Sequence, residues 1–144
     1  MILIYAEIEV VRLYAGVNRP QTWIDQHPNY SKMQERMCES ITKEGLRYPL
    51  ACINEKCDGT YKVSTGNQRL HALQTLGIEK AKCVVACKPD EVGKPEGRVL
   101  TGVSEVYPLY GGDFKQIIEN FGCFQIRPSD VDEWDPDLVF PNKG

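Results

Sequence analysis

The stretch "VSTGNQRLHALQTLG", residues 63–77, joins an apolar run to a leucine-rich segment through a single internal glycine, Gly66. The leucines of its second half recur at helical spacing, and Gly77 is typical of a helix end. Residues 67–76 are therefore predicted to form a helix that begins directly after Gly66. The chain would then pass from a strand, through one glycine, into the first turn of a helix.

A junction of this kind leaves the first amide groups of the helix without intrahelical acceptors. Together with the positive end of the helix dipole, these amides form an anion site. Gly66 allows the backbone to approach a ligand closely, and Arg69 can donate two parallel hydrogen bonds to a phosphate. We therefore predict a phosphate or carboxylate site. Its donors would be Ser64, Thr65, Gly66, Asn67 and Gln68, with the positive charge of Arg69.

A purely structural turn is the alternative reading of the same residues. Asn67 would then cap the helix, and Arg69 would pair with a nearby acid such as Glu44. The local pattern alone leaves both readings open.

A second helix is predicted over residues 31–45. Ser31 and Gln34 have the spacing of a capping box, in which two side chains satisfy the first amides of a helix, and Gly45 is a natural stop. The buried face of this helix is expected to comprise Met33, Met37 and Ile41.

Short apolar runs predict the strands. They cover residues 1–14, 48–53, 60–64 and 80–86, and the proline-containing segment 16–30 is predicted to be a loop. The second and third of these strands are close enough in sequence to form a hairpin. The fold class expected is α+β, with a small mixed sheet and flanking helices.

This order of elements resembles the N-terminal domain of the ParB/sulfiredoxin superfamily over residues 30 to about 87. The shared features are a serine-isoleucine pair and a glycine at the end of the first helix, a strand that begins near a proline, and a glycine-x-x-arginine turn that opens the second helix. In this sequence they are Ser40, Ile41, Gly45, Pro49, Gly66, Arg69, Leu76 and Gly77.

The resemblance implies a nucleotide site. In ParB proteins the glycine-x-x-arginine turn binds the triphosphate of CTP, and Gly66 and Arg69 match that turn. The segment from Gly45 to Pro49 matches the lining of the nucleotide pocket, with Tyr48 where glutamine is common. Tyr48 would either stack on a base or pack in the protein. The cofactor implied is CTP, ATP or ADP with Mg²⁺.

The resemblance also bears on catalysis. Sulfiredoxins place their catalytic cysteine directly after the turn glycine, where this chain has Asn67, so repair of sulfinic acids would lack its nucleophile. Free-serine kinases of this superfamily use a carboxylate as base near the turn. Glu39 and Glu44 are the candidates here.

Composition and cysteine spacing set the broad class. No apolar run approaches the length of a membrane span, and the first residues lack the pattern of a signal peptide. The six cysteines contain no C-x-x-C pair, which favours reduced structural thiols and predicts no metal site. We therefore expect a cytoplasmic protein, or one in the host cytoplasm if the source is viral, with no membrane partner.

Charge is distributed unevenly. Residues 1–88 carry a net charge of +3 and residues 89–144 carry −6. The domain division predicted is 1–88 for the ParB/sulfiredoxin-like domain and 89–144 for a linker, a short helix at 113–122 and an acidic extension, which has five carboxylates between 130 and 137.

Three functions remain open at this point. The first is a nucleotide- or phosphate-binding domain that acts in DNA-associated processes, without the helix-turn-helix of partition proteins, as in small phage or mobile-element members of the family. The second is an enzyme of the same fold, either a free-serine-type phosphotransferase or a metal-dependent nuclease, with Glu39 or Glu44 as base or ligand. The third is a non-catalytic interaction protein that uses its acidic tail. DNA or a DNA-processing protein would be the partner.

Overall fold

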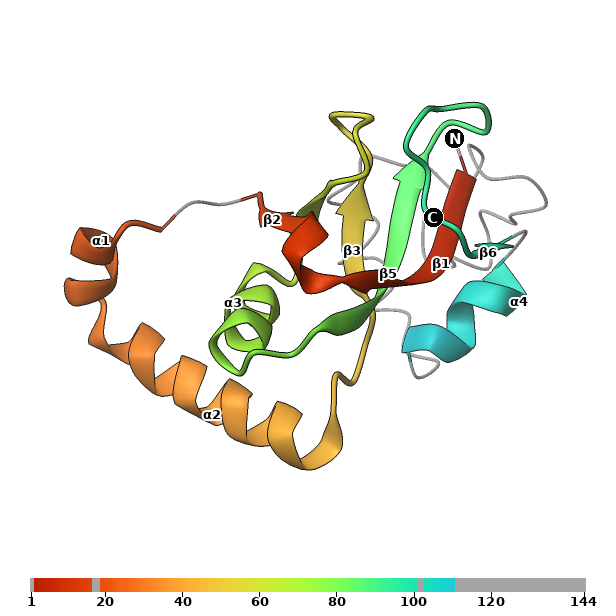
Figure 1. Ribbon diagram of the computed structural model, residues 1–144. Coiled ribbons are helices and arrows are strands. Elements are labelled where there is room, and N and C mark those ends of the chain that lie inside the picture. Colours follow the sequence, from red (N-terminus) through yellow and green to blue (C-terminus); the bar gives the residue numbers. More distant parts are fainter. Residues whose placement is uncertain (1, 17–18, 101–102, 111–144) are drawn as a thin grey trace, which may run out of the picture.

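The computed structural model describes residues 2–16, 19–100 and 103–110, which form a six-stranded mixed sheet with helices on both faces (Figure 1). In chain order the elements are β1 (Ile2–Glu9), η1 (Val10–Arg12), β2 (Leu13–Ala15), α1 (Gln21–Asp25), α2 (Pro28–Glu44), β3 (Leu50–Ile53), β4 (Tyr61–Thr65), α3 (Asn67–Thr75), β5 (Lys80–Cys87), β6 (Arg98–Leu100), α4 (Val103–Val106) and η2 (Tyr107–Tyr110). The predicted fold class, α+β with a mixed sheet, is confirmed.

The strand order in the sheet is β2-β4-β3-β5-β1-β6. β3 and β4 form the predicted antiparallel hairpin, while β3 runs parallel to β5 and β2 runs parallel to β4. β1 lies antiparallel between β5 and β6. The parallel β3–β5 pair requires a crossover, and α3 supplies it, so the start of α3 lies at the end of β4.

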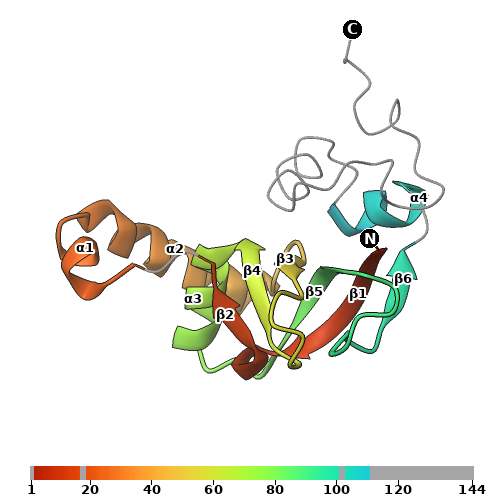
Figure 2. The ribbon, with the colours of Figure 1, turned by 90° about the horizontal axis from the view of Figure 1, so that it is seen from above.

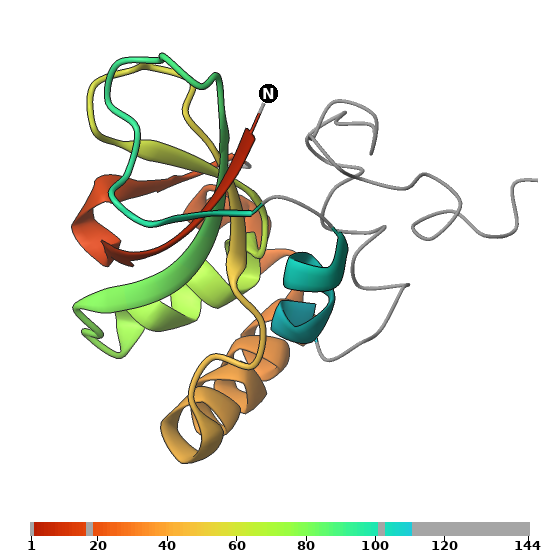
Figure 3. The same cartoon turned by 90° about the vertical axis from the view of Figure 1, so that its right-hand side faces the viewer.

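Each face of the sheet has its own apolar core, because alternate residues of a strand point to opposite faces. Leu70 and Leu73 of α3 and Ile41 of α2 cover one face. Val106 and Tyr110, from α4 and η2, cover the other. Figure 3 shows α4 on the opposite side of β3 from α3. In Figure 2, α1 lies at one end of the described structure, and α4 and β6 lie at the other.

Helix α2 differs from the prediction at its start. It begins at Pro28 rather than at residue 31, with His27 as the N-cap residue. The expected capping box is wrong, because Gln34 instead donates from Nε2 to the carbonyl oxygen of Gln68, at 3.0 Å. Proline fits the first turn of a helix, where its missing N–H needs no partner.

The prediction of the buried face of α2 is confirmed only in part. Ile41 is buried and Met37 packs against the core, but Met33 is 47% exposed. Four-residue spacing drifts around a helix of 3.6 residues per turn, so a residue two turns from the core contact points to solvent. The helix ends as expected at Gly45, which has a φ of 75°.

The segment 16–30 is not the continuous loop that its prolines suggested. It contains α1 and the first residues of α2. The N-terminal segment 1–14 is likewise two strands, β1 and β2, separated by the 3-10 turn η1. β1 pairs with β5, whereas β2 pairs with β4 at the far edge of the sheet.

After residue 88 the structure adds a strand, β6, that pairs with β1. The helix expected at 113–122 and the acidic run at 130–137 lie outside the described residues, and the division after residue 88 stays a prediction. In the described part of the chain, no helix combines the length and apolar character needed to cross a bilayer. The five cysteines described, Cys38, Cys52, Cys57, Cys83 and Cys87, are free thiols.

The buried thiol of Cys87 and the half-buried phenol of Tyr14 predict a loss of stability in alkali. Burial raises the pKa of Cys87 from 9.0 to about 11, and burial with a hydrogen bond to Glu55 raises that of Tyr14 from 10.0 to about 12. The folded pKa values exceed the unfolded ones, so the folded state favours the protonated forms and stability is lost as pH rises through the folded pKa. The urea midpoint should stay level from pH 7 to about 9 and then fall towards about pH 11.

The Cys87→Ala variant is the control for this titration. Its urea midpoint should fall less steeply between about pH 9 and 11, because one of the groups that titrates only on unfolding has been removed. An equally steep fall in the variant would show that Cys87 does not contribute to the pH dependence.

Candidate functional site

Gly66 sits between β4 and α3 in a conformation that favours glycine. As the N-cap residue it has φ 107° and ψ 24°, in the left-handed region, and the amide of Leu70 donates to its carbonyl at 2.8 Å. Among the described side chains none caps α3. Within the described part of the chain, the first three amides of the helix, those of Asn67, Gln68 and Arg69, have no acceptor. The helix therefore presents unsatisfied donors at its positive end.

The Arg69 guanidinium folds back over this turn. Its Nη1 donates to the carbonyl oxygen of Tyr48 at 2.7 Å, and a methyl group on Gly66 would stand 2.8 Å from its Nη2. Burial lowers the pKa of Arg69, and the nearby phenol of Tyr110 opposes that shift. Arg69 pairs with no carboxylate among the described residues, so the alternative pairing with Glu44 is wrong.

Tyr48 packs against the protein rather than standing free. Its ring stacks on Tyr110 with centroids 6.1 Å apart, and the Arg47 guanidinium lies 5.9 Å from its centroid. Pro49, the next residue, is buried. This segment therefore holds the backbone carbonyl of Tyr48 in place for Arg69 and supports the turn from one side.

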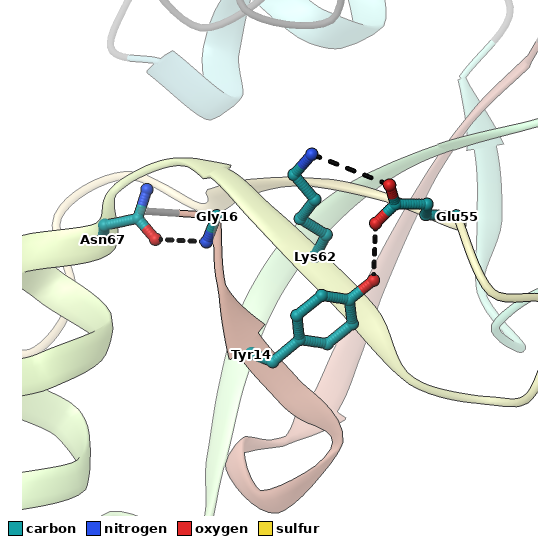
Figure 4. Close-up of polar contacts among 5 residues, drawn as sticks. All are labelled: Tyr14, Gly16, Glu55, Lys62 and Asn67. Atoms are coloured by element: carbon teal, nitrogen blue, oxygen red, sulfur yellow. Dashed lines mark hydrogen bonds and ion pairs between the residues drawn. The ribbon is translucent and has the colours of Figure 1, made fainter. Parts of the chain in front are cut away.

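The structural alternative predicted that Asn67 caps the helix, and this prediction is wrong. It is the first residue of α3, and its Oδ1 accepts a hydrogen bond of 2.8 Å from the amide of Gly16, at the end of β2 (Figure 4). Gly16 itself has no room for a side chain, because a Cβ there would lie 2.6 Å from the carbonyl oxygen of Val63. The contact ties the end of β2 to the first turn of α3.

Figure 4 also shows three polar side chains in contact with one another, from β2, from β4 and from the turn between β3 and β4. Tyr14 donates from its hydroxyl to Glu55 at 2.9 Å, and Lys62 lies 3.8 Å from the other oxygen of that carboxylate. Ser64, the next outward residue of β4, is half-buried. Thr65 pairs through its backbone with Ala51 of β3.

A cavity of about 200 Å³ opens beside the start of α3. Asn67 and His71, one turn apart on α3, form one wall, and Arg19 and Tyr30 approach from the segment that precedes α2 and from α2 itself. Among the residues that the structure describes, no aspartate or glutamate lines this cavity. The guanidinium of Arg19 brings a positive charge to its described lining, which suits an anionic ligand.

Aromatic rings hold the two basic side chains at this cavity. The Arg19 guanidinium lies 5.1 Å from the Trp23 ring centroid and 5.4 Å from that of Tyr30. The Tyr30 hydroxyl lies 2.9 Å from Nδ1 of His71. Among described residues Arg19 has no carboxylate partner, so its charge faces the cavity uncompensated.

Sequence reasoning missed Arg19, Tyr30 and His71 as site residues. One usable signal existed, because positions 67, 71 and 74 are all polar and fall on one face of a helix. Arg19 had no such signal, since only the path of the chain between β2 and α2 brings it to α3.

The two candidate carboxylates lie in other cavities. Glu39 lines a cavity of about 350 Å³ between α2 and α3, which it shares with Cys38 and His71. Glu44 lines a third cavity, at the far end of α3. Both side chains are exposed. In the described ranges no three histidine, cysteine, aspartate or glutamate side chains converge at metal-binding distance.

Comparison with known proteins finds similarity only among solved structures. No family model and no curated protein matches the sequence. A free serine kinase in complex with AMP matches 60% of this chain, with 23% identity and a TM-score of 0.46. Sulfiredoxin from Arabidopsis thaliana matches 59%, with 22% identity and a TM-score of 0.45. A Pnob8-like ParB-N domain matches 58%, with 19% identity and a TM-score of 0.39.

These structures are of the superfamily that the sequence motifs resemble. The match spans 32% of the kinase chain, 86% of the sulfiredoxin chain and 29% of the ParB-N chain. With TM-scores below 0.5, they describe partial similarity of fold and carry nothing about activity. The phage origin stays a prediction.

Proposed function

We propose that this protein binds the phosphate group of a nucleotide at the start of α3. The observation that carries the proposal is that three amides without acceptors at that helix end lie beside a cavity whose described lining includes a cation, Arg19, and no acid. Backbone amides at a helix N-terminus are well suited to phosphate oxygens. Arg19 adds a guanidinium that no carboxylate neutralises in the described residues.

The residues present fit a phosphate better than a whole nucleotide. A volume of about 200 Å³ is smaller than the ~300–1,000 Å³ of most pockets for drug-sized ligands. The phosphate would accept hydrogen bonds from the amides of Asn67 and Gln68 and from Arg19. Nη1 of Arg69 already donates a hydrogen bond to the carbonyl oxygen of Tyr48. Arg69 would therefore contribute its positive charge next to Gly66 rather than a pair of hydrogen bonds to the phosphate.

The nucleotides to test are CTP, ATP and ADP, each with and without Mg²⁺. Mg²⁺ commonly binds through substrate phosphates and one or two carboxylates and keeps several waters, so it would arrive with the phosphate.

An association with DNA is the second part of the proposal. Fluorescence anisotropy of labelled duplex DNA, with and without nucleotide, tests it independently of the nucleotide titration.

Thermal unfolding with each nucleotide and with inorganic phosphate tests the site. A ligand at 100 times its dissociation constant should stabilise the fold by about 2.7 kcal/mol. Arg19→Ala should weaken binding by more than about tenfold, because a hydrogen bond to a charged group contributes about 1.5–3 kcal/mol. Arg69→Lys should weaken it less, because the lysine keeps the charge.

Arg98→Ala is the matched control, because Arg98 also lies over an aromatic ring, 5.7 Å from the centroid of Tyr5, but on β6. Its affinity for nucleotide should equal that of the wild type. If no phosphate compound shifts the unfolding temperature, or if Arg98→Ala weakens binding as much as Arg19→Ala, the proposed site is wrong.

A further inference from the structure

A series of aromatic rings leads from the cavity beside α3 to the surface of α1. Tyr30 and His71 line that cavity, and their rings stack with centroids 6.0 Å apart. Trp23 of α1 meets the Tyr30 ring edge-on at 5.4 Å. His27 stacks on Trp23 with centroids 4.0 Å apart and 15° between the ring planes. These four rings form one continuous aromatic cluster.

Arg19 connects the aromatic cluster to the proposed phosphate site. Its guanidinium lines the cavity and also lies over the rings of Trp23 and Tyr30. The acid of α1, Asp25, accepts a hydrogen bond of 2.9 Å from Gln21 on the same helix. Asp25 is two residues from Trp23, and side chains at that spacing do not face each other on a helix. The cluster therefore combines aromatic rings with a positive charge.

Packing within the fold does not account for the outer end of the cluster. Helix α1 has five residues, none of which is buried, and Figure 1 shows it apart from the sheet, next to the start of α2. Trp23 is half-buried and His27 is exposed. Among the described residues, no ring other than Trp23 lies against His27. Rings that stack at a surface rather than in a core are well suited to contact a partner.

We propose that the aromatic cluster binds the unpaired bases of single-stranded DNA, with a backbone phosphate at the start of α3. This inference rests on the proposed phosphate site and names the form of DNA that the site accepts. Proteins that bind single strands combine positive charge for the backbone with aromatic rings on which bases stack. A base would stack on the side of His27 away from Trp23. The bases of a duplex are not available for this contact, because they are paired and stacked on one another.

The probe is fluorescently labelled oligothymidylate, compared with a strand of the same length and label that lacks bases. In fluorescence anisotropy at one salt concentration, oligothymidylate should bind the full chain at least about fivefold more tightly than the abasic strand. Fivefold corresponds to about 1 kcal/mol, the lower end of what one base stacked on an aromatic ring contributes. Annealing the probe to oligoadenylate should remove this advantage, because its bases become paired.

Three variants locate the contact. His27→Ala should weaken binding of oligothymidylate about fivefold and leave binding of the abasic strand and of inorganic phosphate unchanged. His27→Phe keeps a ring and should bind oligothymidylate as the wild type does. Trp134→Phe leaves Trp23 as the one tryptophan, and its indole N–H signal in NMR should shift in a saturable way with oligothymidylate. Arg98→Ala, which removes the cation over the Tyr5 ring, is the control and should change none of these affinities.

The outcomes separate this inference from the proposed function. If inorganic phosphate or a nucleotide binds, but the abasic strand binds as tightly as oligothymidylate, the stacking inference is overturned and the phosphate site stands. The inference is also overturned if His27→Phe binds as weakly as His27→Ala, or if the Trp23 signal does not shift. If neither strand and no phosphate compound binds, the proposed function is wrong as well.

Discussion

Alanine in place of Gly66 should lower the free energy of unfolding by about 2–4 kcal/mol. A non-glycine residue held at φ 107° costs about 1–3 kcal/mol. The added methyl would also stand 2.7 Å from Cδ2 of Leu50 and 2.8 Å from Nη2 of Arg69, so at least one of these side chains must move. Urea denaturation, with the slope compared between variants, measures the loss.

Gly77→Ala is the matched control for this change. Gly77 also has a positive φ, 68°, but a Cβ there would meet nothing within 4 Å. It should therefore lose only the conformational part, about 1 kcal/mol. If the two variants lose equal stability, the close packing of Leu50 and Arg69 around Gly66 makes no contribution.

Asn67→Asp should separate folding from binding. The aspartate would keep an oxygen that accepts the amide of Gly16, and a negative charge in the first turn of α3 should add about 0.3–1 kcal/mol of stability. The same charge faces the cavity that is proposed to bind phosphate. Because the aspartate carboxylate would repel the phosphate, phosphate affinity should fall at least about tenfold although the amide and guanidinium donors remain.

Asn67→Ala completes the test by removing the side-chain contact to Gly16 without adding charge. It should destabilise the fold by about 1 kcal/mol, and it should bind phosphate better than the aspartate variant does. Urea denaturation and isothermal titration with the tightest-binding nucleotide provide both measurements. Undiminished affinity in Asn67→Asp would contradict a phosphate site at this helix end.

The local sequence determined the elements around the junction. Leucine spacing and the two glycines placed α3 within one residue of its observed bounds, Asn67–Thr75. Short apolar runs also placed β3, β4 and β5. These features depend on contacts between residues close in the chain, which the order of residues specifies directly. The start of α2 was predicted wrongly, because Pro28 rather than the expected capping box of Ser31 and Gln34 opens the helix.

Only the tertiary structure decided how the side chains at the junction are used. Arg69 was expected to extend towards a ligand, but the chain places the carbonyl of Tyr48 within its reach. Arg19 comes from a segment nearly fifty residues before α3 and still lines the cavity beside it. Such contacts depend on where distant segments meet in space, and no periodicity along the chain encodes that. The sequence determined where a helix begins with open amides, and the packing of β2, α1 and α2 determined which cations lie around them.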